Sequence, residues 1–173
     1  MIEYITEKRR LIKEVGDINL IQPLTNINPI LNRNINVKIH INDKLVVLTL
    51  KLRRLTKNEY KVFIPDVLKT IPEFYNLEYT INGDQYQFIK SDYSMLIRIM
   101  KTIVDFTIGC IKKFDIQGII IVPADKHGTN EKTDKQKQML YSAILNHNLP
   151  SDFSNRNIDW EDIKYNIIHK TLK

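Results

Sequence analysis

The fold is decided by residues 91–122, which read SDYSMLIRIMKTIVDFTIGCIKKFDIQGIIIV. The first two thirds place apolar side chains nearly all the way round a helix, which predicts a helix from about 91 to 114 that is buried on most sides. Residues 116–122 form an apolar run without alternation, which is typical of a strand covered on both faces. The stretch therefore predicts a central core helix that leads into a buried strand.

Upstream of that helix, apolar and polar residues alternate with the period of two that a half-buried strand requires. The alternating segments are 37–41, 45–52, 60–64, 77–81 and 86–88, and a short helix is expected within 66–75. Asn42-Asp43 and Asn82-Gly83 are turn dipeptides, and Asn-Gly between two such runs is a strong hairpin signal. The spacing predicts an antiparallel meander.

Downstream of the buried strand, a polar loop at 124–132 precedes the capping-box sequence TDKQ at 133–136, which begins a second helix. After Pro150 we expect a loop at 151–157 and a last amphipathic helix from Asp159. Strands followed by helix, strand and helix predict an α+β (mixed α/β) domain. We divide the chain into an N-terminal helix and extended arm (1–36), an α+β core (37–150) and a C-terminal helical tail (151–173).

The two ends of the chain carry more apolar residues than a solvated linker needs. The arm is rich in Asn and Pro, and the tail helix would have one apolar face. Such segments lie across the body of a protein or across a neighbour, so we interpret both as partner-binding. The residues concerned are Leu20, Ile21, Leu24, Ile27, Ile30, Leu31, Trp160, Ile163 and Ile167.

The net charge of +6, from 26 basic and 20 acidic side chains, excludes no class of partner. Nucleic-acid binders concentrate basic residues on one face. Here they are spread along the chain, which favours an ordinary solvated surface. A short cluster at Lys51, Arg53 and Arg54 on the predicted meander keeps nucleic-acid binding open as an alternative.

No constellation of catalytic or metal-binding residues stands out. Cys110 is the single cysteine and sits in the apolar helix, where a thiol acts as a small hydrophobe. The four histidines lack metal-ligand spacing, so we expect no metal and no cofactor. No apolar run approaches the roughly 20 residues that span a bilayer, so we expect no membrane partner.

The order of elements from residue 91 onward resembles the back half of the acyl-CoA N-acetyltransferase (GNAT) fold. In that family the first helix of the trio receives the CoA pyrophosphate at its amino end, where free N–H groups and the helix dipole favour phosphate. The family's glycine-rich sequence is replaced here by FIKSDYS at 88–94, in which Asp92 would repel phosphate. The resemblance implies that KQKQMLY at 135–141 is the family's later helix, and that Tyr141 would protonate the leaving thiolate.

The chain is also similar to a group of small bacteriophage proteins with a strand, a Ser/Pro-Ala-Asp-Lys turn and a Lys-Leu-Tyr helix. The residues that carry this similarity are VPADK at 122–126 and MLY at 139–141. In that group a GNAT-like fold occurs without an evident active site. The composition agrees with such a source, because 28 Ile, 19 Lys and 16 Asn against two Ala indicate AT-rich codons.

Three functions follow from these observations. The first is a non-enzymatic structural or interaction protein, a bacteriophage virion component located in the virion or the host cytoplasm, which docks on other subunits through its terminal arms. The second is an N-acetyltransferase-like enzyme with a degenerate CoA site and Tyr141 as its acid. The third is a nucleic-acid-binding accessory protein that uses Lys51, Arg53 and Arg54.

Overall fold

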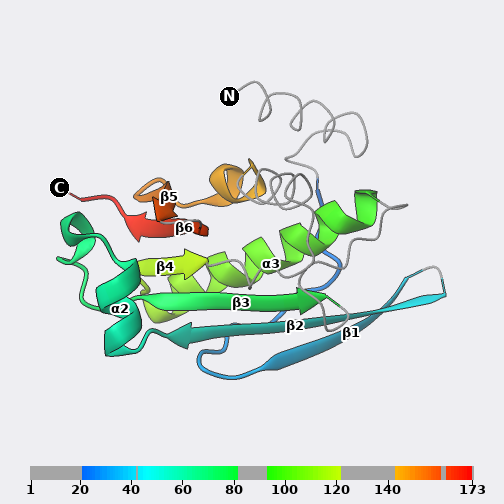
Figure 1. Ribbon diagram of the computed structural model, residues 1–173. Helices are drawn as coiled ribbons and strands as arrows, with labels where there is room; N and C mark the ends of the chain where they lie inside the picture. Colours follow the sequence, from blue (N-terminus) through cyan, green and yellow to red (C-terminus); the bar gives the residue numbers. More distant parts are fainter. Residues whose placement is uncertain (1–20, 42, 82–92, 122–142, 161–162, 173) are drawn as a thin grey trace.

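The computed structural model describes residues 21–41, 43–81, 93–121, 143–160 and 163–172. Six strands form one mixed sheet in the order β1-β2-β3-β4-β6-β5, which confirms the α+β class. The strands are β1 (Ile35–Ile41), β2 (Lys44–Arg54), β3 (Tyr75–Ile81), β4 (Gly118–Ile121), β5 (Phe153–Trp160) and β6 (Ile163–Lys170). The helical elements with described bounds are α2 (Lys57–Phe63), the 3-10 turn η2 (Asp66–Leu68) and α3 (Tyr93–Phe114) (Figure 1).

The predicted meander is confirmed for its first two strands and for β3. β1 pairs with β2, and β2 with β3, both antiparallel. Asp43, in the turn between β1 and β2, has a φ of 64°, a conformation that Asp tolerates better than most residues. The alternation of β2 places Val46, Leu48, Leu50 and Leu52 in the core. The hairpin return strand expected at 86–88 lies outside the described residues, as do the loop at 124–132 and the first 20 residues, where the N-terminal helix is expected.

The central helix is confirmed as α3, which crosses one face of the sheet (Figure 1). It links β3 to β4, and these are parallel neighbours, as a crossover helix requires. Their register covers only two pairs, Tyr75 with Ile119 and Asn76 with Ile120. The largest core cluster forms between α3 and the sheet, and its α3 members include Ile97, Met100, Ile103, Val104, Phe106 and Ile111.

The strand predicted at 60–64 is wrong, because residues 60–63 form the end of α2 and Ile64 is its C-cap. Thr56 and Glu59 make a complete capping box, in which each side chain accepts a hydrogen bond from the other residue's backbone N–H. This satisfies N–H groups that a helix start leaves free, and so stabilises a short helix here. The predicted short helix in the following segment is present as the single turn η2.

The opposite face of the sheet is covered at one end by α2 and η2. A second buried cluster forms there from Leu55, Ile64, Leu68, Ile71, Phe74, Ile120, Tyr165 and Ile167. Phe74 is fully buried and its ring lies 6.0 Å from that of Tyr60 in a tilted arrangement. The Tyr60 hydroxyl donates to the carbonyl of Ile71 over 2.6 Å, which ties α2 to the chain after η2.

The C-terminal helix predicted from Asp159 and the loop predicted at 151–157 are both wrong. β5 and β6 pair antiparallel with each other, and β6 lies between β4 and β5. Residues 165–169 are all buried, because an inner strand is covered on both faces. Such a continuous buried run hides the period of two, and the spacing of Ile163 and Ile167 imitates a helical face. β5 and β6 therefore extend the sheet where a helical tail was predicted.

Candidate interaction surface

The predicted N-terminal arm lies along its own helix as far as the structure describes it. Residues 21–34, here called the N-terminal strap, follow α3 from Arg98 to Lys113 (Figure 1). The N–H of Leu24 donates to Thr102 Oγ1 over 2.8 Å, and Arg98 donates to the carbonyls of Gln22 and Pro23. The strap is thus fixed to the core by polar contacts at several points.

The apolar side chains of the strap are largely committed to the core of the same chain. Ile21 is buried, and Leu24, Ile27 and Leu31 pack against the main cluster, whereas Ile30 is 40% exposed. Asn32, with a φ of 62°, turns the chain into β1, and its amide oxygen accepts from the N–H of Arg54. Leu20 lies outside the described residues.

The predicted partner-binding residues of the tail lie within the β5–β6 hairpin. Ile167 is fully buried in the second core cluster. Trp160 and Ile163 are the pair nearest the hairpin turn, and their side chains lie outside the described part of the structure. Of the predicted arm residues whose side chains are described, all but Ile30 pack into the fold of the same chain.

Two of the three basic residues predicted for nucleic-acid binding have carboxylate partners in the same chain. Arg53 makes two hydrogen bonds of 2.7 Å to Glu59 and one of 2.5 Å to Glu78. Hydrogen bonding to Arg53 lowers the pKa of Glu59 from 4.5 to about 2. Arg54 pairs with Glu73 at 3.0 Å, and Lys51 lies opposite Glu78 in the β2–β3 register. The charge of the predicted cluster is therefore largely compensated within the chain.

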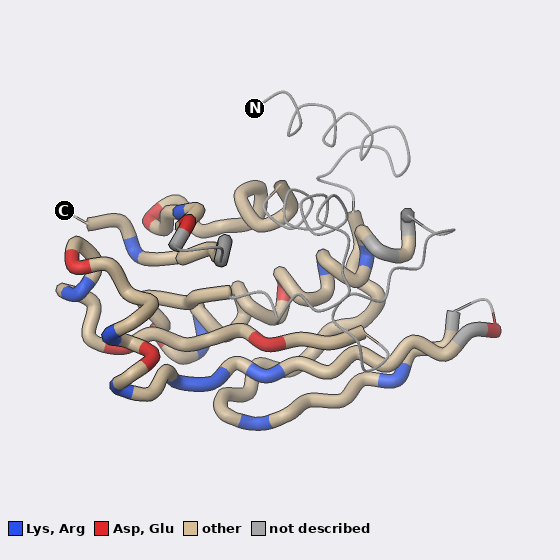
Figure 2. Tube along the Cα trace, in the orientation of Figure 1, with Lys and Arg blue, Asp and Glu red and all other residues tan. Residues whose placement is uncertain are grey.

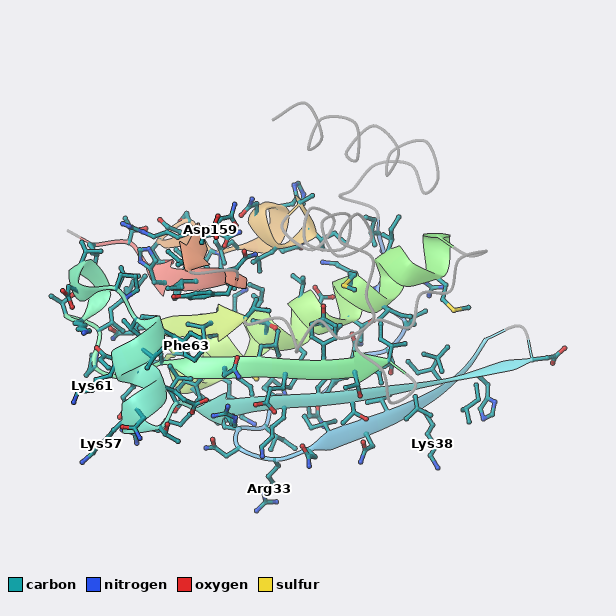
Figure 3. All side chains as sticks on the ribbon, in the orientation of Figure 1. Arg33, Lys38, Lys57, Lys61, Phe63 and Asp159 are labelled. Atoms are coloured by element: carbon teal, nitrogen blue, oxygen red, sulfur yellow. The ribbon has the colours of Figure 1, made fainter. Side chains whose placement is uncertain are left out.

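Several exposed cations lack such compensation among the described residues, and four of them lie on or next to β1 and α2. We call Arg33, Lys38, Lys57 and Lys61 the basic border. In the described part of the chain no carboxylate lies within ion-pair distance of any of them. Figure 3 shows them projecting along the side formed by α2 and β1, whereas Asp159 on β5 lies on the opposite side.

The strands beside this border reinforce its positive charge. β1 and β2 contain Lys and Arg but no Asp or Glu, as Figure 2 shows along both strands. The only acidic residue between them is Asp43, in the turn. The sequence analysis missed the border because Arg33 and Lys38 look no different from other scattered basic residues. The signal that could have found it is Lys38 within the alternation of 37–41.

β1 is an outer strand of the sheet, with β2 as its neighbour on one side. Two residues separate the paired Ile41 and Lys44, and a two-residue loop closes on a hydrogen-bonded pair. Hydrogen-bonded and non-hydrogen-bonded residue pairs then alternate along the two strands. Asn36, Lys38 and His40 belong to non-hydrogen-bonded pairs, so their backbone N–H and C=O groups point away from β2. The direct contact between Thr49 Oγ1 and Asn36 Oδ1 at 2.8 Å fits a closely spaced non-bonded pair.

For the segment whose sequence resembles the GNAT fold, the structure describes α3 and β4 but little of the expected CoA site. α3 begins at Tyr93, and residues 88–92 and Tyr141 lie outside the described residues. Cys110 is fully buried in α3, and burial raises the pKa of its thiol from 9.0 to about 11. A buried thiol with a raised pKa is a poor nucleophile, so Cys110 is a packing residue.

No protein-family model, curated protein or solved structure matches the chain. Among the described residues no group of three or more His, Cys, Asp or Glu side chains is arranged to hold a metal ion. Within the same residues, no helix combines the length and the apolar character needed to cross a membrane. The basic border and the adjacent edge of β1 are therefore the candidate site, on the geometry of the described residues.

Proposed function

We propose that this chain is a non-enzymatic interaction protein, a component of a larger assembly such as a bacteriophage particle in the virion or the host cytoplasm. The observation that supports this is the basic border, where four exposed cations beside an outer strand have no acidic partner among the described residues. Other exposed lysines, such as Lys112 and Lys170, also lack a carboxylate partner among the described residues. The border differs from them in lying beside β1 and β2, two strands that contain no Asp or Glu. Complementary charge across an interface steers encounter and fixes register, so the border is the surface we assign to docking.

The apolar terminal arms enter this proposal differently from the sequence hypothesis. Most of their described side chains pack into the fold of the same chain, so we assign the partner contacts to the basic border and not to the arms. Among the predicted arm residues Ile30 stays exposed, and it lies three positions before Arg33. The other subunit is expected to present acidic groups, because opposite charges are needed to match four cations.

A charge-reversal variant tests the proposal. Lys38→Glu combined with Lys57→Glu is expected to release the chain from its assembly, since each change replaces an attraction with a repulsion. In a sucrose gradient of lysate from the natural source cells, the wild-type chain should sediment with a particle much larger than its own 20.4 kDa. At least a tenfold smaller share of the variant should do so.

The matched control is Lys112→Glu with Lys170→Glu, which makes the same change in net charge at exposed positions outside the border. It should sediment like the wild type. A wild-type chain that sediments alone, or a control that is released as fully as the border variant, would contradict the proposal.

A second candidate is an acyl-CoA-binding protein of the acetyltransferase type. The observation that favours it is the parallel pair β3 and β4, joined by the buried helix α3 and in register over two residue pairs. Ligands of open α/β sheets bind beyond the carboxyl ends of such adjacent parallel strands. Tyr141 and residues 91–94 would then serve the roles that the GNAT resemblance implies.

Isothermal titration calorimetry with acetyl-CoA decides this candidate. A dissociation constant below about 1 mM, which corresponds to a binding free energy of roughly −4 kcal/mol, would support this candidate. Unchanged acetyl-CoA binding by the Lys38→Glu/Lys57→Glu variant would show that the CoA site is separate from the basic border. Absence of heat at millimolar acetyl-CoA would eliminate it. Dethiolated CoA is the control for binding through the nucleotide alone.

A further inference from the structure

We propose that the outer edge of β1 accepts an extended acidic segment of a partner protein as an additional strand of the sheet. This inference rests on the proposed function and names the chemistry of the partner. An exposed strand edge offers a row of backbone donors and acceptors that an extended peptide can pair with. Among the described residues, β1 has a strand neighbour only on its β2 side.

The backbone geometry of β1 identifies the residues that would pair with an added strand. Asn36, Lys38 and His40 direct their backbone groups outward, on the alternation set by the β1–β2 turn. Their side chains are exposed and stand on the face of the sheet opposite α3. A residue paired with Lys38 on an added strand would therefore place its side chain beside the ammonium group, and a carboxylate is the group that fits.

The other face of the added strand has a different requirement. Ile35 and Val37 are partly buried and pack against the main core, and Ile39 is half-buried on the same face. An added strand would extend this apolar surface with its own alternate side chains. The partner segment is thus an alternation of acidic and apolar residues, about seven residues or 23 Å long at roughly 3.3 Å per residue.

Charge also argues against two other occupants. In a second copy of the chain paired antiparallel about Lys38, Lys38 would face Lys38, and like charges directly opposite are destabilising. Lysine on an edge strand likewise discourages pairing with an uncharged apolar strand. Lys38 therefore disfavours both of these occupants and attracts an acidic segment, so it contributes to the specificity of the edge.

Nucleic acid fits this edge less well than an acidic peptide. Single-stranded nucleic acid is held by aromatic side chains that stack on the bases, in addition to cations. β1 and β2 contain no Phe, Tyr or Trp. Arg53 and Arg54, the two arginines of β2, are paired with carboxylates of the same chain. The edge therefore offers backbone pairing and ammonium groups, which match a peptide.

Fluorescence anisotropy with the full chain tests the inference. The probe is a labelled nine-residue peptide of alternating Glu and Val, and the comparison probes are its Lys/Val counterpart, a version with central proline, and a nine-nucleotide single-stranded DNA. We expect the Glu/Val peptide to bind at least tenfold more tightly than each comparison probe. Proline should weaken it because it removes a donor and breaks the extended pairing, with the acidic charge retained.

Two variants of the protein locate the site. Lys38→Glu should weaken peptide binding at least tenfold. His40→Pro should do the same while it keeps Lys38, because the N–H that it removes points away from β2 and proline is tolerated at such edge positions. Thermal melting verifies that both variants remain folded, and hydrogen exchange of Asn36, Lys38 and His40 amides should slow when the peptide is added.

Several outcomes would overturn the inference. Equal binding of the proline peptide and its parent would show attraction by charge without strand pairing. Tighter binding of the DNA would assign the surface to nucleic acid. Absence of peptide binding would also overturn it, and a wild-type chain that still sediments with a large particle would then leave the proposed function standing with a different docking mode.

Discussion

Replacing Phe74 with alanine is expected to lower the free energy of unfolding by about 3–5 kcal/mol, the range for deleting a fully buried aromatic ring. Phe74 is 0% exposed and lies at the centre of the second core cluster, between the α2–η2 segment and the sheet. Its loss leaves a cavity that Leu68 and Ile120 can fill only in part. Urea unfolding followed by circular dichroism measures the change from the shift in midpoint at constant slope.

The control is Phe114→Ala, at the exposed end of α3. Phe114 is 38% exposed, so its removal should cost less than about 1 kcal/mol. Similar losses for the two variants would mean that the ring of Phe74 is not buried as the structure has it.

Gly118 provides an independent check of the same packing. A Cβ at Gly118 would overlap the ring of Phe74, so Gly118→Ala should destabilise the wild type by about 1–3 kcal/mol through overpacking. In a Phe74→Leu background the cost should be smaller, and the double-mutant cycle should give a coupling of at least about 0.5 kcal/mol. Additive effects of the two changes would contradict the contact.

The elements that could be predicted from sequence are those whose pattern of buried and exposed side chains depends on one neighbouring layer of the fold. The alternation of residues 46–52 indicated β2, because only alternate side chains of that strand are buried. The apolar surface of residues 95–111 indicated α3, because that helix is buried on nearly every side. In both cases the local periodicity and the tertiary environment agree.

The elements that could not be predicted depend on partners far away in the sequence. β6 is strand because β4 and β5 pair with both of its edges, and β4 lies about fifty residues upstream. Ile163 and Ile167 are spaced as on a helix, and nothing local reveals the pairing. For residues 60–64, five alternating positions suggested a strand, whereas the Thr56–Glu59 capping box was the decisive local signal.

The candidate site was only partly visible for a similar reason. In the sequence, Lys38 on a predicted strand and Arg53 directly after one are equivalent scattered cations of the predicted meander. The register of β2 with β3 brings Glu78 near Arg53, and the capping box brings Glu59 to it as well. Lys38, on an outer strand, receives no such partner among the described residues. Which cations stay available is therefore a property of the topology, and composition alone does not reveal it.

The second large effect is expected from Arg53, which joins the β2–β3 ladder to the start of α2. Arg53→Met should lower the free energy of unfolding by about 2–3 kcal/mol, below the 3–5 kcal/mol of a fully buried pair because the side chain is 26% exposed. The loss arises because Glu59 and Glu78 are left close together without the guanidinium that holds both. Glu73→Gln, which breaks the exposed pair with Arg54, is the control and should cost less than about 0.5 kcal/mol.

We expect the pH dependence of the free energy of unfolding to reveal the titration of Glu59. Its pKa is lowered on folding from 4.5 to about 2, so its contribution is fully present above pH 4.5 and is lost as the pH falls towards 2. Glu59→Gln removes the titration, so the variant should be less stable than the wild type at pH 7, and the gap should narrow steadily between pH 4.5 and 2. Urea unfolding of both proteins at pH 7, 4, 3 and 2.5 measures this gap. A gap that stays constant over this window would mean that the ion pair with Arg53 contributes nothing to folding, and α2 would then be held by the partly buried Tyr60 and Phe63.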